Sequence, residues 1–238
     1  MTPAPRLSPR LAVAVTVGVL AVVNVVDVRV AHAELVVGPL CAALLLGLAR
    51  LAGLSWAELG LGPGTWRRGA KWAGAVIGLA ALVIAAGAAL PLTREAFRDS
   101  RYHLGWTSAL TTAFVLIPVG TVLVEEVAFR GVLWGLLRRL WGTGAATAIS
   151  SALFGLWHVL PSLGLAASNE AVASVVGRGR SAQATAVLTT VAFTALSGVV
   201  FCELRRRSGS LLAPASLHWA ANGLSVLASA AVWAWGTP

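Results

Sequence analysis

The sequence predicts an all-α protein, a polytopic bundle of about seven transmembrane helices. Of its 238 residues, 58% are hydrophobic and only 11% are charged, with a mean hydropathy of +0.82. A soluble domain is nearer half apolar and one quarter charged, so the composition indicates an integral membrane protein. Apolar runs of about 20 residues recur along the chain, and each can cross a ~30 Å hydrocarbon core as a helix. They lie at about 10–30, 34–54, 69–91, 107–137, 143–161, 183–204 and 210–235.

Positive charges between these runs predict how the chain is oriented. Lys and Arg concentrate in cytoplasmic loops, and a cytoplasmic N-terminus puts more of them inside than outside. The inner set is Arg6, Arg10, Arg50, Arg67, Arg68, Lys71, Arg138, Arg139, Arg205, Arg206 and Arg207, and the outer set is Arg29, Arg94, Arg98, Arg101, Arg178 and Arg180. The net charge of +9 is therefore expected to determine topology, with no nucleic-acid partner. We expect a multi-pass protein of the bacterial cell membrane.

Two regions follow from this order of spans. Residues 1–106 form an N-terminal membrane region with three predicted spans, and residues 107–235 form a core with four. A signal peptide is the alternative for the first span, because Ala31-His32-Ala33 resembles a cleavage site after an apolar stretch. Asp27 and Arg29 precede that site, and an uncleaved first helix is favoured. The segment 54–68 is expected to be an interfacial loop, and residues 162–181 a loop that covers the core.

Three fragments place polar groups inside apolar runs: Glu125-Glu126-Val-Ala-Phe-Arg130, Phe154-Gly-Leu-Trp-His158 and His218-Trp-Ala-Ala-Asn222. Ionisable groups at membrane depth are costly unless paired, so they indicate a functional site. Glu126 and Arg130 are spaced i, i+4 and predict an ion pair on one helix face. Glu125 has no such partner, which suits it to accept a proton as a general base.

The histidine fragments allow a structural interpretation as well, since His and Asn also join membrane helices through hydrogen bonds. The estimated depths of these polar groups in the membrane favour a single site. At 1.5 Å per residue, Glu125 lies ~20 Å, His158 ~22 Å, and His218 to Asn222 ~12–18 Å from the cytoplasmic ends of their helices. Three helices thus bring their polar groups to overlapping depths.

In order, these fragments resemble the CPBP family of intramembrane proteases, which includes the CAAX prenyl proteases and the Abi-type bacteriocin-immunity proteins. The resemblance covers roughly residues 107–230 and implies hydrolysis of peptide bonds in membrane-associated or prenylated-type substrates. It implies that Glu125 is the general base, that His158 helps to hold the attacking water, and that His218 and Asn222 stabilise the oxyanion. Glu126 and Arg130 would support Glu125.

Alternatives to this interpretation concern the metal and the activity. Glu125, His158 and His218 are candidate zinc ligands, with an open fourth position as catalytic zinc prefers. The chain has no His-Glu-x-x-His segment, and a metal-free glutamic mechanism is favoured over zinc. A non-catalytic immunity or scaffold protein that binds a partner peptide is the second hypothesis. A small proton-coupled transporter ranks third, because no inverted repeat is visible.

Overall fold

The computed structural model describes residues 6–30, 33–163, 165, 172, 174, 177 and 179–235. Ala31 and His32 of the alternative cleavage site, Arg178 and most of the expected cover at 162–181 lie outside these residues. The secondary-structure elements of the described part are all helical, which confirms the all-α prediction. The main elements are α1 (Pro9–Arg29), α2 (Glu34–Leu51), α3 (Trp66–Ala89), α5 (Trp106–Thr111), η4 (Thr112–Val122), α6 (Leu123–Glu125), η5 (Glu126–Leu133), α7 (Trp134–Trp157), α10 (Arg180–Ser208), α11 (Leu212–Trp219), η6 (Ala220–Leu224) and α12 (Ser225–Trp235). Short turns at η1 (Pro63–Thr65), α4 (Pro91–Arg94), η2 (Glu95–Phe97) and η3 (Ser100–Tyr102) connect them.

Five helices in the described part are long and apolar enough to cross a membrane: Pro9–Arg29, Glu34–Leu51, Pro63–Ala89, Trp106–Trp157 and Arg180–Ser208. The fourth has 52 residues and contains two of the predicted spans, joined at Gly142, whose backbone is non-helical with a positive φ of 80° and ψ of 177°. The helical run from α11 to α12 occupies the last predicted span. The chain is therefore an integral multi-pass membrane protein, while the count of seven spans stays a prediction.

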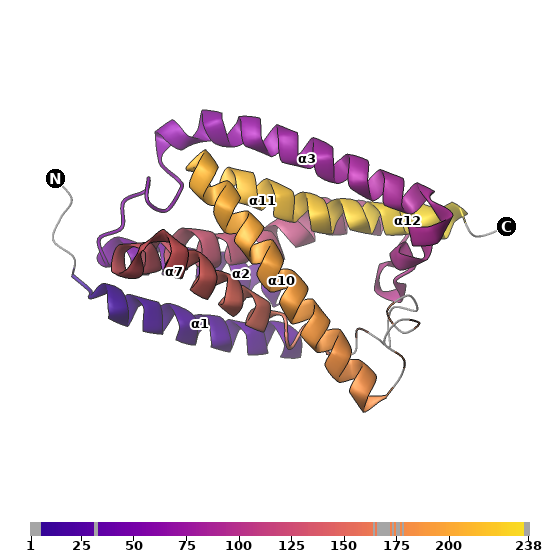
Figure 1. Ribbon diagram of the computed structural model, residues 1–238, viewed down its shortest axis with the longest axis horizontal. Helices are drawn as coiled ribbons and strands as arrows, with labels where there is room; N and C mark the ends of the chain where they lie inside the picture. The colour runs from indigo at the N-terminus through magenta and orange to yellow at the C-terminus, as the bar shows by residue number, and fades with distance from the viewer. Residues whose placement is uncertain are drawn as a thin grey trace.

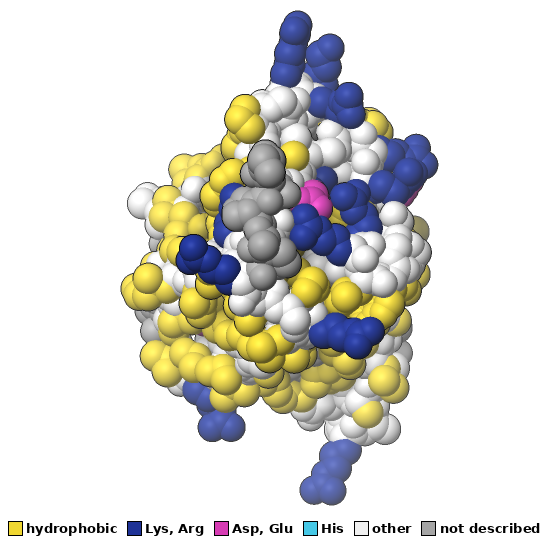
Figure 2. All heavy atoms as spheres, turned by 90° about the vertical axis from the view of Figure 1, so that its left-hand side faces the viewer, with side chains coloured by type: hydrophobic (Ala, Val, Ile, Leu, Met, Phe, Trp, Pro, Cys, Tyr) yellow, Lys and Arg dark blue, Asp and Glu magenta, His cyan; other side chains and the backbone are white. Residues whose placement is uncertain are grey.

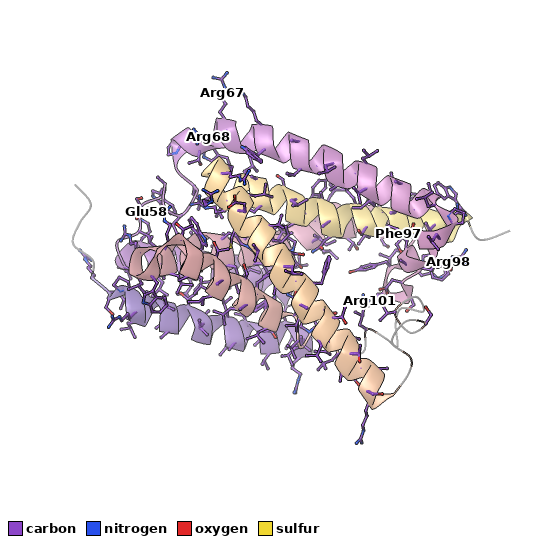
Figure 3. The ribbon with its side chains drawn as sticks, in the orientation of Figure 1. Glu58, Arg67, Arg68, Phe97, Arg98 and Arg101 are labelled. Atoms are coloured by element: carbon purple, nitrogen blue, oxygen red, sulfur yellow. The ribbon has the colours of Figure 1, made fainter. Side chains whose placement is uncertain are left out.

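The helices form an elongated bundle (Figure 1). α3 runs beside α11 and α12 along one side, α1 packs against α2 and α7, and α10 crosses α7 diagonally. α1 begins at one end of the bundle and α12 finishes at the other. The predicted inner and outer charges separate in the same way, because Arg67 and Arg68 lie at the end opposite Arg98 and Arg101 (Figure 3). Lys and Arg side chains ring the end that carries Arg67 and Arg68 (Figure 2).

Small residues let the central helices approach closely, as is common where membrane helices pack. A methyl group at Gly155 of α7 would lie 2.7 Å from the Val191 carbonyl oxygen of α10. One at Gly198 of α10 would lie 3.0 Å from the Cα of Ser151. Large apolar side chains face outward instead, including Leu79, Leu82 and Val83 of α3, Leu188, Phe193 and Leu196 of α10, and Leu44 of α2. The crossing therefore packs the part of α7 that leads to the Phe154-to-His158 fragment closely against α10, and lipid can cover the outer faces.

The interfacial loop expected at 54–68 ends earlier, because α3 already begins at Trp66, and the loop closes one end of the bundle. Its Leu54 and Leu59 are fully buried, and Glu58 forms an ion pair with Arg139. Arg205 of α10 donates a hydrogen bond to the Glu58 carbonyl oxygen at 2.7 Å. Gly60 has a φ of +80°, and a methyl group there would lie 2.6 Å from Nε of Arg205. Glycine is thus required at this position for both the backbone conformation and the approach of the guanidinium group.

Candidate active site

The polar fragments lie on helices that contain wide, π-helical turns. Glu125 ends α6, which joins two π-helical segments, η4 and η5. Pro118 lies inside η4, where its missing N–H removes a regular helical hydrogen bond. Asn222 lies in a third π-helical segment, η6. Such turns are rare and occur often at functional sites, because they redirect side chains that a regular α-helix would turn away.

Glu126 is the centre of a buried ion network. Its Oε1 accepts a hydrogen bond from Nη1 of Arg130 at 3.1 Å, as the i, i+4 spacing predicts. The same oxygen lies 2.8 Å from Nδ1 of His218, on α11. Since an ionised carboxylate can only accept, His218 donates through Nδ1. Glu126 therefore fixes both the ring orientation of His218 and the position of the Arg130 guanidinium.

Aromatic rings enclose this network. The Arg130 guanidinium carbon lies 3.9 Å from the ring centroid of Phe154 and 4.7 Å from that of Phe201, and the residue is fully buried. Its Nε and Nη2 have no hydrogen-bond partner among the described residues, and cation–π contacts stabilise the charge instead. The Phe201 ring also stacks on His218, with centroids 5.1 Å apart. Phe154 of the second fragment thus packs against the guanidinium charge of Arg130 in the first fragment.

Glu125 is held differently from Glu126. Its Oε1 accepts a hydrogen bond from the indole Nε1 of Trp157 at 2.9 Å. Its Oε2 lies 3.7 Å from Nε2 of His218, and no described residue donates a hydrogen bond to it. The residue is only 5% exposed, although it lines a cavity of about 620 Å³. One carboxylate oxygen is therefore anchored, and the other has an unused lone pair in a water-poor site.

His158 and Asn222 line the same cavity as Glu125. Both also line an adjoining cavity of about 270 Å³, whose wall includes His218 and Phe201. The Nδ1 atom of His158 lies 2.8 Å from the Phe154 carbonyl oxygen. A carbonyl only accepts, so Nδ1 carries the proton, and Nε2 is the remaining nitrogen of the ring. The two histidines are thus oriented in the same manner, each through Nδ1.

All six residues singled out from the sequence meet at these two adjoining cavities or in the network behind them. Glu126, Arg130 and His218 form the buried network, while Glu125, His158 and Asn222 line the larger cavity. Three further residues contact this site and were not predicted: Trp157, Phe201 and Asn24. Trp157 precedes His158 directly, so its position in the motif is the one signal that indicated it. Phe201 and Asn24 lie in other apolar runs, where nothing in the local pattern separates them from packing residues.

The zinc alternative requires donors that converge on one point. Within the described ranges, no three His, Cys, Asp or Glu side chains are arranged to hold a metal ion, and this includes Glu125, His158 and His218. Nδ1 of each histidine is hydrogen-bonded, to Glu126 and to the Phe154 carbonyl group, which leaves Nε2 as the ring nitrogen that a metal would use. The three side chains do not converge on one point in the described part of the chain, and a metal-dependent mechanism stays the alternative to the glutamic one.

Comparison with known proteins gives one match. The family model described as type II CAAX prenyl endopeptidase Rce1-like matches residues 106–224, which is half of the chain and includes all three fragments. The chain belongs to this Rce1-like family. Membership implies a CAAX-type intramembrane endopeptidase that acts on a peptide or membrane-associated substrate in a lipid bilayer. No curated protein and no solved structure matches the chain. α1 to α3 precede the matched residues, yet Asn24, Asp27 and Glu34 of α1 and α2 line the larger cavity.

Proposed function

We propose that this Rce1-like protein is a glutamic-type intramembrane endopeptidase in which Glu125 activates the attacking water. One observation carries the proposal. Glu125 is buried and anchored through Oε1, while its Oε2 lacks a hydrogen-bond donor among the described residues and the side chain lines a cavity of about 620 Å³. A fixed carboxylate next to a cavity, with a free oxygen, has the geometry that a general base requires.

The first step is proton transfer from water. Glu125 Oε2 accepts one proton of a water molecule while the water oxygen forms a bond to the carbonyl carbon of the scissile peptide. His158 lines the same cavity, and its Nε2 is the nitrogen left to orient that water. Burial favours this step because fixed dipoles replace bulk solvent around the reacting groups.

The second requirement is stabilisation of the oxyanion that forms on the carbonyl oxygen. Asn222 lines both cavities and can donate through its amide. His218 donates to Glu126 through Nδ1, so donation through Nε2 requires the ring to carry both protons. When the intermediate collapses, the C–N bond breaks and the proton on Glu125 passes to the leaving amine.

The test is cleavage by purified protein in liposomes. The substrates are a prenylated peptide that ends in a CAAX sequence and an unprenylated transmembrane peptide, with product termini identified by mass spectrometry. We expect Glu125→Gln to lower kcat by about 10²–10⁴-fold, the usual contribution of a general base. Glu203→Gln is the matched control, because Glu203 forms exposed ion pairs with Arg206 and Arg207. Undiminished cleavage by Glu125→Gln would overturn the assignment.

The metal-free part of the proposal has its own test. We expect cleavage to survive exhaustive treatment with a zinc chelator, and elemental analysis of the active protein to find no stoichiometric zinc. Loss of cleavage on chelation, with recovery on adding zinc alone, would replace the glutamic mechanism by a metal-dependent one.

A further inference from the structure

The C-terminal end of α7 lacks one regular hydrogen bond, and the sequence explains why. Trp157 is the last residue of α7, so its carbonyl group has no partner within the helix, and only a further turn would offer it the backbone N–H four residues later. That residue is Pro161, which has no N–H. Asn24 of α1 supplies the missing donor, with its Nδ2 2.8 Å from the Trp157 carbonyl oxygen. A side chain from the first helix thus completes the end of α7.

The hydrogen bond from Asn24 fixes the backbone of Trp157, whose indole ring contacts Glu125. The Trp157 ring lies edge-on to Phe129, with centroids 5.9 Å apart and an interplanar angle of 72°. Its Nε1 then points to Oε1 of Glu125, at 2.9 Å. Asn24 is 8% exposed, and it lies outside the residues that match the Rce1-like family. A continuous chain of hydrogen bonds therefore runs from Asn24 through Trp157 to Glu125.

We propose that Trp157 is a positioning residue for Glu125 and that Asn24, in turn, positions Trp157. By holding Oε1, the indole keeps the carboxylate in the rotamer that presents Oε2 to the cavity. A hydrogen bond from an N–H group also stabilises the ionised carboxylate, which is the form able to accept a proton. The inference rests on the proposed role of Glu125.

The decisive measurement is the pH dependence of kcat/KM for the wild type and Trp157→Phe. Phenylalanine keeps an aromatic ring and removes the N–H donor. Because the ionised carboxylate loses a donor, the acid limb should move to higher pH, by about one to two units for a hydrogen bond to a charged group. Below neutral pH, kcat should fall more than KM rises. Asn24→Leu removes the donor to the Trp157 carbonyl and should move the limb in the same direction by less.

The other ionisable groups near Glu125 are the same in every variant. Those facing it in the described part of the chain are His218, Glu126 and Arg130 in the network and Asp27, Glu34, Tyr102 and His158 around the cavity. A shift confined to the Trp157 and Asn24 variants is therefore due to the lost hydrogen bonds.

Trp134→Phe is the matched control. Trp134 is 1% exposed, and its Nε1 donates a hydrogen bond to Thr147 at 3.2 Å, away from both cavities. Loss of this bond should leave the acid limb where it is in the wild type. If Trp157→Phe does not fold, benzothienylalanine at position 157 replaces the N–H with sulfur in a ring of nearly the same shape.

The outcomes separate this inference from the proposed function. An inactive Glu125→Gln together with a shifted limb in Trp157→Phe supports both. An inactive Glu125→Gln with an unshifted limb, or with an equal shift in Trp134→Phe, overturns only the positioning role. Full activity of Glu125→Gln overturns the assignment of the base, and the positioning role with it.

Discussion

Two glutamate–arginine clusters of this protein show how differently the same chemistry is used. In the loop that closes one end of the bundle, Arg139 donates to both carboxylate oxygens of Glu58 at 2.7 Å. The backbone N–H and the hydroxyl group of Ser55 donate to the same carboxylate at 2.8 and 2.7 Å. The side chains of Glu58 and Arg139 are 25% and 33% exposed. In the bundle interior, Glu125 and Glu126 are almost completely buried, and each has one oxygen without a hydrogen-bond partner in the described structure.

The difference follows from solvation. Water can complete the coordination of Glu58, so its cluster gains modest stability at little desolvation cost. The interior cluster pays a large desolvation cost and leaves polar atoms unsatisfied, a combination that proteins retain mainly where chemistry needs it. We therefore expect substitutions in the loop to change stability with little effect on cleavage. Substitutions in the interior should separate into those that affect folding and those that affect chemistry.

Arg130→Met should have the largest effect on stability. It leaves Glu126 as a buried charge without its ion pair, which typically costs about 3–5 kcal/mol. Thermal and denaturant unfolding in detergent micelles would measure this loss. The double variant Arg130→Met/Glu126→Gln removes both charges and should recover much of it. Wild-type stability in the single variant, or a double variant less stable than the single, would show that the pair is not coupled as described.

Gly60→Ala should have the next largest effect, in the loop cluster. The substitution forces a left-handed backbone on alanine and displaces the Arg205 guanidinium, and together these should cost about 3 kcal/mol. Gly209→Ala is the control, because Gly209 has a φ of +70° with no atom within 4 Å of an added methyl group. It should cost only about 1–2 kcal/mol, the backbone part. Equal losses in denaturant unfolding would mean that the contact with Arg205 contributes nothing.

Glu58→Gln and Glu125→Gln should behave in opposite ways. Glu58→Gln weakens a partly exposed ion pair, so it should lower the free energy of unfolding by about 1 kcal/mol and leave cleavage unchanged. Glu125→Gln removes a charge whose Oε2 lacks a hydrogen-bond donor, so the protein should be at least as stable while cleavage is lost. Parallel unfolding and cleavage assays would check both. The comparison fails if Glu58→Gln inhibits as strongly as Glu125→Gln.

The pH dependence of stability gives the smallest effect. Partial burial raises the pKa of Glu58, but the hydrogen bonds from Arg139 and Ser55 outweigh it and lower the pKa from 4.5 to about 2. A carboxyl group with a lowered pKa stabilises the fold above its unfolded value, and that stabilisation is lost as pH falls toward the folded value. The stability difference between wild type and Glu58→Gln should therefore be constant above about pH 5 and shrink between pH 4.5 and 2. A difference that grows on acidification would contradict this sign.

The pattern of neighbouring residues in the sequence was sufficient to predict the helices and one of the ion pairs of this protein. Apolar runs predicted the helices, because a helix satisfies its own backbone hydrogen bonds and needs only length and hydrophobicity to cross a bilayer. The i, i+4 spacing predicted the pair of Glu126 and Arg130, and helical rise placed the three fragments at overlapping depths. The spans predicted at 107–137 and 143–161 were expected to be separate, whereas the structure joins them in one helical run that is interrupted at Gly142.

The contacts that orient the site were decided by tertiary structure alone. Trp157 and Glu125 are 32 residues apart, His218 and Glu126 are 92 apart, and Asn24 and Trp157 are 133 apart. Each pair depends on the rotation and crossing of two separate helices, and in lipid these are set by side-chain packing rather than by hydrophobicity. The sequence by itself predicted the apolar helices and which polar groups they carry. Only the packed bundle decided that the indole of Trp157 holds Glu125 and that Glu126 orients His218.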